Sequence, residues 1–148
     1  MPNIQKLKKG LRTQNREIIK LNEINSVELS QLIEELEDLY ESDMYEELLI
    51  NVDRILLNNP RNSFTWMMKG EALRMIERYK EALSASEIAI ELDSENDSAH
   101  GTKGSILRAM GRYDEALTAI NRALELNPEH EWVAINKEKI ISSLEQVI

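Results

Sequence analysis

The sequence predicts an all-α fold, a solenoid of about three stacked helix pairs with a capping helix at each end. Two observations predict it. Residues 69–83 (KGEALRMIERYKEAL) and residues 103–117 (KGSILRAMGRYDEAL) are identical at nine of fifteen positions. The offset of 34 residues then continues through Ala89/Ala123, Glu91/Glu125 and Leu92/Leu126. A fixed period of this length is typical of repeat proteins, in which each unit buries its apolar face against its neighbours.

The composition agrees with a helical repeat protein. Charged residues make up 30% of the 148 residues and aromatic residues only 5%. Three prolines and five glycines leave few breaks in helices, and no cysteine is available for disulfides, thiol catalysis or metal binding. No apolar run approaches the ~20 residues that a membrane-spanning helix needs. We therefore predict a cytoplasmic protein.

Charge is unevenly distributed along the chain. The net charge of −9 argues against nucleic-acid binding, which requires a basic face. Residues 1–28 nevertheless carry six basic against three acidic side chains, whereas residues 29–62 carry nine acidic against two basic ones.

Residues 4–24 predict a basic amphipathic helix, in which Ile4, Leu7, Leu11, Ile18 and Leu21 follow a 3.5-residue repeat. We interpret residues 1–28 as a half-repeat that caps the stack by packing on the first full repeat. Two alternatives stay open. The apolar seam can pair with a second chain, or the helix can lie on an anionic membrane.

Residues 29–62 predict a degenerate first repeat, since Tyr45 lies one period before Tyr79. Leu36 and Leu48 occupy positions at which the later repeats have glycine and alanine. Because these leucines add bulk where helices would otherwise approach closely, we expect looser or shifted packing in this repeat.

Residues 63–96 and 97–130 predict two regular repeats, in which Gly70 and Gly104 allow close helix contact. Residues 77–78 and 111–112 are expected to form the turn within each repeat. Asn59-Pro60 and Asn127-Pro128 predict a capping side chain followed by proline at the first helical position. Residues 128–147 predict a last helix, so that residues 131–148 form a C-terminal cap.

The 34-residue period, with a small residue, a tyrosine and two alanines at set offsets, resembles the tetratricopeptide repeat. The resemblance implies a pair of antiparallel helices, A and B, in each repeat. It also implies that the pairs stack into a right-handed superhelix, whose concave groove receives extended peptides or partner helices.

The resemblance further implies which side chains line this groove, namely those at positions 2, 5, 9, 12 and 13 of each helix A. They are Ile33, Glu37, Tyr40, Glu41, Phe64, Met67, Glu71, Arg74, Met75, Ser98, Gly101, Ser105, Arg108, Ala109, Trp132, Ile135 and Lys139. The large apolar members make good anchors for a partner, and Arg74 and Arg108 can hold a partner carboxylate. Two alternatives stay open: Trp132 can seal the end of the core, and the arginines can pair with Glu71 and neighbouring acids.

The sequence contains no recognisable catalytic constellation. His100 and His130 could hold a metal ion, but packing or a helix start explains them better. The acids within residues 34–38 could form an acid–base or calcium site, but a solvated helix face explains them better. Lys69, Lys103 and Lys137 recur at the 34-residue period and are expected to make exposed ion pairs; a ladder for an anionic ligand is the alternative.

One known activity of the family is not expected. Members that bind chaperone tails carry a basic residue and an asparagine at positions 5 and 9 of their first repeat. Here those positions hold Ile33 and Glu37. We therefore predict a non-catalytic protein–protein interaction adaptor without cofactor or metal. Its ligand would be a partner peptide or helix with apolar anchors and an acidic group. The alternative is a self-assembling scaffold, in which the terminal helices or the groove pack on another copy.

Overall fold

The computed structural model describes residues 25–147, which form seven α-helices and no strand. The helices are α2 (Ser26–Glu41), α3 (Tyr45–Asn58), α4 (Ser63–Met75), α5 (Tyr79–Leu92), α6 (Asp97–Ala109), α7 (Tyr113–Leu126) and α8 (Glu131–Val147). None of the helices described is long and apolar enough to cross a membrane. The predicted helix over residues 4–24, and most of the predicted N-terminal cap, lie outside the described residues.

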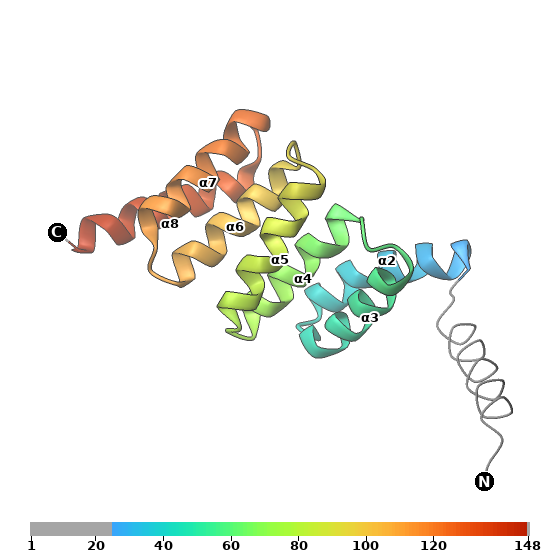
Figure 1. Cartoon of the computed structure of the whole chain (residues 1–148). Coiled ribbons are helices and arrows are strands. Elements are labelled where there is room, and N and C mark those ends of the chain that lie inside the picture. The colour runs from blue at the N-terminus through green and yellow to red at the C-terminus, as the bar shows by residue number, and fades with distance from the viewer. Residues whose placement is uncertain (1–24, 148) are drawn as a thin grey trace, which may run out of the picture.

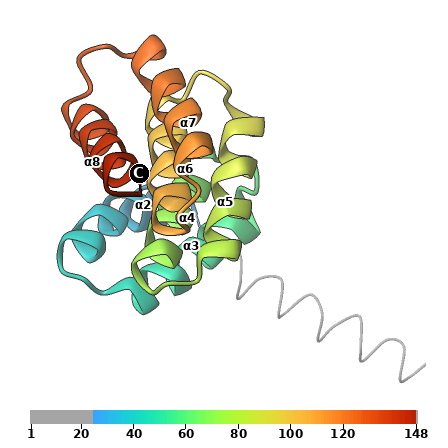
Figure 2. The same ribbon diagram turned by 90° about the vertical axis from the view of Figure 1, so that its left-hand side faces the viewer.

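The helices stack as consecutive antiparallel pairs, α2/α3, α4/α5 and α6/α7, and α8 covers the last pair (Figure 1). The first helices of the pairs, together with α8, form one side of the stack, and α3, α5 and α7 form the other (Figure 2). The core follows the stack as three clusters, centred on Leu36 and Val52, on Leu73 and Ile106, and on Ile120 and Ile140. This arrangement confirms the predicted all-α solenoid.

The N-caps of the first helices differ from the predicted ones. Asn59 and Asn127 are C-caps of α3 and α7, and Pro60 and Pro128 lie in the turns that follow. The prediction that these Asn-Pro pairs begin helices is therefore wrong. Instead, three other asparagines cap the helices: the side chains of Asn25, Asn62 and Asn96 accept hydrogen bonds from the backbone N–H three residues later. The cap at Asn25 starts α2 at Ser26, three residues before the predicted boundary of the first repeat.

The turn within each pair uses a residue in the left-handed conformation. Asp43, Glu77 and Gly111 have φ angles of 58°, 64° and 75°. In the third pair, the Arg112 N–H donates to the Leu107 carbonyl at 2.9 Å, and the Gly111 N–H donates to the Arg108 carbonyl at 3.0 Å. These two hydrogen bonds form a Schellman motif, which satisfies the last carbonyl groups of the helix. The turns predicted at residues 77–78 and 111–112 are confirmed.

Gly70 on α4 and Gly104 on α6 lie where each of these helices packs closely on its partner in the pair. A Cβ atom on Gly104 would lie 2.5 Å from Ile120 Cγ1, and one on Gly70 would lie 3.3 Å from the Ala82 carbonyl oxygen. In the first pair the corresponding Leu36 is fully buried, and α2 and α3 make fewer close contacts with each other than α4 and α5 do. This difference agrees with the looser or shifted packing predicted for the repeat that has leucine in place of glycine.

Candidate functional site

A hollow lies on the side of the stack formed by α2, α4, α6 and α8, which we call the groove. Figure 1 shows α2 and α8 at opposite ends of this row of helices, with α4 and α6 between them. The groove contains a cavity of about 190 Å³, lined by Tyr40, Met67, Met68, Glu71, Ser98, Thr102, His130 and Trp132. All four helices contribute to this lining or flank it, so the cavity exists only in the assembled stack.

A polar network crosses from α2 to α4 at the wall of this cavity. Glu71 Oε2 accepts hydrogen bonds from Arg74 Nε at 3.1 Å and from Arg74 Nη2 at 2.8 Å. The Tyr40 hydroxyl donates to the same oxygen at 3.4 Å. The other oxygen, Oε1, is buried and has no hydrogen-bond partner among residues 25–147. One oxygen of the Glu71 carboxylate thus accepts three hydrogen bonds, and the other accepts none from the described residues.

The electrostatics of the network follow from this geometry. Burial raises the pKa of Tyr40, and the negative charge of Glu71 raises it further. Burial alone would lower the pKa of Arg74, but the adjacent Glu71 carboxylate outweighs it, so that this pKa is raised. Arg74 therefore carries a charge that is already neutralised inside the protein, as in the alternative left open by the sequence.

Arg108, one repeat after Arg74, is in a different situation. The place of Glu71 is taken by Ser105, whose hydroxyl donates to Asn136 Oδ1 on α8 at 2.9 Å. Within the described part of the chain Arg108 makes no ion pair, and its buried Nε has no hydrogen-bond partner. Of the two predicted carboxylate-binding arginines, only Arg108 retains an unused charge.

Helix α8 covers part of the surface that was predicted to be open. A Cβ atom on Gly101 would lie 2.8 Å from Val133 Cγ2 and 2.9 Å from Trp132 Cζ3, and Ser105 is 1% exposed. The prediction that Gly101 and Ser105 line the open groove is therefore wrong, because α8 packs directly on them. Trp132 covers Gly101 and still leaves 37% of its own surface exposed at the rim of the cavity.

The remaining predicted groove residues divide into a packed and an exposed group. The packed group consists of Ile33, Tyr40, Phe64 and Met67. These side chains are half-buried and contact the core cluster of the first pair. Glu37, Met75 and Ile135 are exposed, the last two by 39% and 54%.

Residues 98–130, which comprise α6 and α7, match the family profile of the tetratricopeptide repeat. The chain has a tetratricopeptide-repeat fold. Solved tetratricopeptide-repeat domains share its arrangement of helices. No curated protein sequence matches the chain.

Three solved structures illustrate the likeness of fold. The first repeat domain of Spaghetti (RPAP3), bound to the HSP90 peptide SRMEEVD, has a TM-score of 0.73 at 20% identity, over 82% of this chain and 97% of that one. The Yersinia enterocolitica type III secretion chaperone SycD, in complex with a peptide of YopD, has a TM-score of 0.69 at 20% identity, over 84% and 95%. The Thermobaculum terrenum O-GlcNAc transferase has a TM-score of 0.74 at 22% identity, over 76% of this chain and 22% of that one. A similar fold thus also forms part of a larger transferase chain.

The two histidines of the tetratricopeptide repeats are engaged separately. His100 Nε2 lies 3.0 Å from the Ser94 carbonyl, and His130 Nε2 lies 3.3 Å from Ser98 Oγ. Among the described residues no three histidine, aspartate or glutamate side chains gather as metal ligands. The acids of residues 34–38 are exposed on α2.

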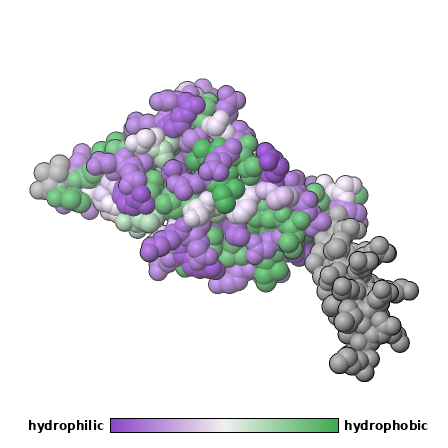
Figure 3. Space-filling view, in the orientation of Figure 1, coloured by the Kyte–Doolittle hydropathy of each residue, from purple (hydrophilic) through white to green (hydrophobic). Residues whose placement is uncertain are grey.

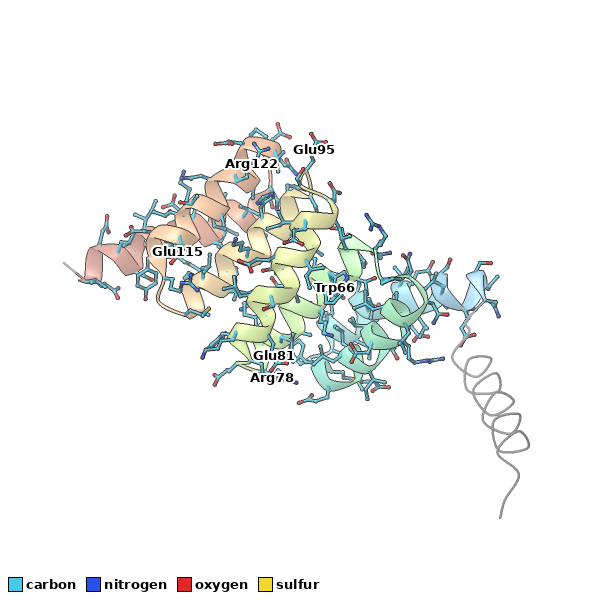
Figure 4. The ribbon with its side chains drawn as sticks, in the orientation of Figure 1. Trp66, Arg78, Glu81, Glu95, Glu115 and Arg122 are labelled. Carbon is cyan, nitrogen blue, oxygen red and sulfur yellow. The ribbon has the colours of Figure 1, made fainter. Side chains whose placement is uncertain are left out.

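The outer side of the repeats carries paired charges. A second hollow, of about 350 Å³, lies between α5, α6 and α7. Its lysine, Lys103, lies 3.3 Å from Glu87, and its Arg122 lies 3.0 Å from Glu125, while Lys69 lies 2.9 Å from Asp53 nearby. The ion pairs predicted for Lys69 and Lys103 are confirmed, whereas the pair predicted for Lys137 is not formed among residues 25–147. Figure 4 shows a further pair, Arg78 and Glu81, at the start of α5. Because these cations are already neutralised, the outer hollow is a weaker candidate than the groove.

Sequence reasoning missed the side chains that join one repeat to the next. Asn96 caps α6 and also donates from Nδ2 to Ser63 Oγ at 2.9 Å, and Asn136 joins α8 to α6 through Ser105. A signal was present for the first, because Asn62 and Asn96 lie one period apart. No comparable signal existed for Asn136, which has no counterpart in the other repeats.

Proposed function

We propose that this chain is a non-catalytic adaptor that binds a peptide or helix of a partner protein in the groove. The observation that carries the proposal is the cavity of about 190 Å³ between Met67 and Trp132, together with the unpaired Arg108 on the adjacent helix. Large apolar and aromatic side chains in a desolvated pocket are typical hot spots of protein interfaces. Two of the similar structures, Spaghetti and SycD, hold peptides of other proteins, which supports the proposal.

The proposed ligand offers a bulky apolar side chain and at least one carboxylate. The apolar side chain would enter the cavity against Met67, whose flexible thioether adapts to ligands of different shape. The carboxylate would bind Arg108 in preference to Arg74, since the Arg74 guanidinium is already occupied by Glu71. The net charge of −9 excludes general nucleic-acid binding from the proposal, and a cytoplasmic location stays a prediction.

The proposal can be tested with peptides selected from a displayed library of random sequences against the whole chain. The strongest peptide is then titrated in a Trp66→Phe background, which leaves Trp132 as the only tryptophan of the two in the sequence. We expect the Trp132 emission to shift on binding. Met67→Ala should cost about 1–2 kcal/mol of binding free energy, as expected for a hot spot. Arg108→Glu should weaken binding at an unchanged melting temperature.

Lys80→Glu provides the matched control, because it makes the same change of charge on α5, away from the groove. If it weakens binding as much as Arg108→Glu, or if no selected peptide changes the Trp132 emission, the groove is not the binding site.

A self-assembling scaffold is the second candidate, and one observation favours it. Ile50 and Leu57, one heptad apart on α3, are 62% and 71% exposed. The corresponding residues of the later repeats are polar: Ser84 and Thr118 for Ile50, and Glu91 and Glu125 for Leu57. An apolar stripe that appears on only one of three equivalent helices suggests a contact specific to that helix.

A further inference from the structure

We infer that the groove is charge-polarised, and that it selects a ligand whose acidic groups lie toward α8 and whose basic groups lie toward α2. This inference rests on the proposed function and adds the charge pattern and direction of the ligand. The ligand is a peptide segment that carries opposite charges at its two ends.

The charge of the groove changes sign along the stack. At positions 9, 12 and 13, α2 presents two acids, Glu37 and Glu41, whereas α4 presents the neutralised pair of Glu71 and Arg74. At the same positions, α6 presents Arg108 as its only charged residue, and α8 presents Lys139 as its only charged residue. Successive helices therefore contribute two negative charges, none, one positive charge and one positive charge.

Contacts between neighbouring first helices show how their side chains align along the groove. The Tyr40 hydroxyl contacts Glu71, and Ser105 contacts Asn136, each 31 residues later in the chain. The same offset joins Gly101 and Trp132. Because the repeat is 34 residues long, each position on one of these helices lies beside the position three residues, or about one turn, earlier on the next helix, along one edge of the groove. Arg108 and Lys139 follow Ser105 and Asn136 by three residues, or about one helical turn, and so lie on that edge together.

The charged side chains at both ends of the groove have no oppositely charged partner within the described part of the chain. Within residues 25–147, the side chains of Glu37, Glu41 and Lys139 make no hydrogen bond and no ion pair, and Arg108 Nε is buried without a partner. By contrast, Arg78, Arg112 and Arg122 on the outer side each pair with a glutamate three residues later. A cation that is partly desolvated and unpaired favours an anionic ligand, because the ligand supplies the missing counter-charge.

A row of apolar side chains runs beside the charged row. Positions 2 and 5 of the same helices hold five apolar residues, Ile33, Phe64, Met67, Trp132 and Ile135, and the other three are Ser30, Ser98 and Gly101. The ligand would therefore place an apolar anchor between its charged ends, in the cavity bounded by Met67 and Trp132. Three helix-to-helix steps of about 8–10 Å give a groove of roughly 24–30 Å. An extended peptide covers that length with about seven to nine residues, at about 3.3 Å per residue.

The test uses a displayed library of random nonapeptides, selected against the whole chain and against two charge-reversed variants. The variants are Arg108→Glu/Lys139→Glu and Glu37→Lys/Glu41→Lys. For the unchanged chain we expect selected peptides to carry Asp or Glu at one end, Lys or Arg at the other, and a large apolar residue between. The first variant should lose the acidic preference alone, and the second should lose the basic preference alone. Each should bind the peptide selected on the unchanged chain at least about tenfold more weakly.

Direction is tested separately with single cysteines, which are unambiguous because the chain contains none. A spin label on Ser142→Cys in α8, and one on Ser42→Cys after α2, are compared using a selected peptide labelled with ¹⁵N at its acidic end. We expect signal broadening from the α8 label and none from the α2 label.

The outcomes separate the inference from the proposed function. Peptides enriched only in apolar anchors, or broadened equally by both labels, would overturn the charge polarity while leaving a binding groove. Selection that is insensitive to Met67→Ala and Trp132→Ala would overturn both. If acidic ends are selected but basic ends appear only after deletion of residues 1–24, that basic segment occupies the α2 end itself. The two-ended ligand would then be wrong for the whole chain.

Discussion

Glu71 receives both hydrogen bonds of the Arg74 guanidinium on a single oxygen, Oε2, at distances of 3.1 and 2.8 Å. The side chains are only 8% and 17% exposed, so this pair is better shielded from water than the pairs on the outer side of the stack. Glu71→Ser copies the third repeat, in which Ser105 stands at this place. We expect it to lower the free energy of unfolding by about 1–3 kcal/mol, because the Arg74 guanidinium would remain desolvated without its acceptor.

Urea unfolding of Glu71→Ser and of the control Glu81→Ser measures this difference. Glu81 also pairs with an arginine three residues away, but both of those side chains are more than half exposed, and such pairs contribute little. Equal losses in the two variants would show that burial does not strengthen the Glu71–Arg74 pair.

Gly104→Ala should destabilise the protein more than Gly70→Ala. The added Cβ on residue 104 would lie 2.5 Å from Ile120 Cγ1, which forces the helices apart, at a typical cost of about 1–3 kcal/mol. On residue 70 it would meet its neighbours at 3.3–3.5 Å, and the better helix propensity of alanine would offset part of the cost. Thermal unfolding of both variants measures the difference.

A second substitution tests the physical cause of this loss. Gly104→Ala combined with Ile120→Ala should be less destabilised than the sum of the two single changes, because the shorter side chain leaves space for the new methyl group. Additive losses would contradict close approach as the reason for glycine at this position.

Two substitutions in the turns within the repeats should change the free energy of unfolding in opposite directions. Gly111 has φ 75° and nothing within 4 Å of a Cβ atom, so Gly111→Ala isolates the cost of the left-handed conformation, about 1–2 kcal/mol. Glu77 has φ 64° in the preceding repeat, and Glu77→Gly should raise the free energy of unfolding by up to about 1 kcal/mol. Denaturant midpoints that move in the same direction for both variants would refute this account.

The repeating helix pairs could be predicted from the sequence, whereas the residues at which helices begin and end could be predicted only in part. Residues spaced by 34 positions gave the three pairs and their turns, since the same packing contacts recur in each repeat. The Asn-Pro pairs misled because Pro60 and Pro128 fit the first turn of a helix as well as a loop. The actual caps, Asn62 and Asn96, each lie three residues after the C-cap of the preceding helix, Asn59 and Asp93.

The candidate site was predictable at the level of helix faces but not of individual contacts. A helical wheel correctly brings Met67, Glu71 and Trp132 to one side, where they line a common cavity. It contains no information on the next helix, so it did not predict that α8 would bury Gly101 and Ser105. The difference between Arg74 and Arg108 also depends on a neighbour, because one has Glu71 three residues before it and the other has Ser105.

Tyr45 should ionise late, with a measurable effect on stability at alkaline pH. Its hydroxyl donates to Asp43 Oδ1 at 2.5 Å, and this hydrogen bond, with a smaller contribution from burial, raises its pKa from 10.0 to about 12. The folded protein thus holds this proton more tightly than the unfolded chain. The stabilising contribution is complete below pH 10 and is lost as the pH rises through about 12.

Phenolate absorbance as a function of pH, followed in parallel with urea unfolding, measures this effect. Asp43→Asn keeps a side chain that tolerates the left-handed conformation but removes the charge. It should bring the ionisation of Tyr45 to lower pH and flatten the alkaline loss of stability. Identical titrations of the two proteins would mean that the hydrogen bond to Asp43 is not maintained in solution.

The apolar stripe on α3 should promote association between copies of the chain. Figure 3 shows green, apolar atoms gathered over the first helix pair on the face that carries α3. Ile50→Ser with Leu57→Glu installs the residues that α5 has at these positions, Ser84 and Glu91, where they are exposed. Because the side chains at these positions point to water and not to the core, the melting temperature at low concentration should not fall.

Light scattering over a concentration series should then show a smaller weight-average mass for the variant than for the unchanged chain. If both proteins have the mass of a single chain at every concentration, the stripe is not a self-association surface. If Arg108→Glu lowers the mass and the α3 variant does not, the copies associate through the groove instead.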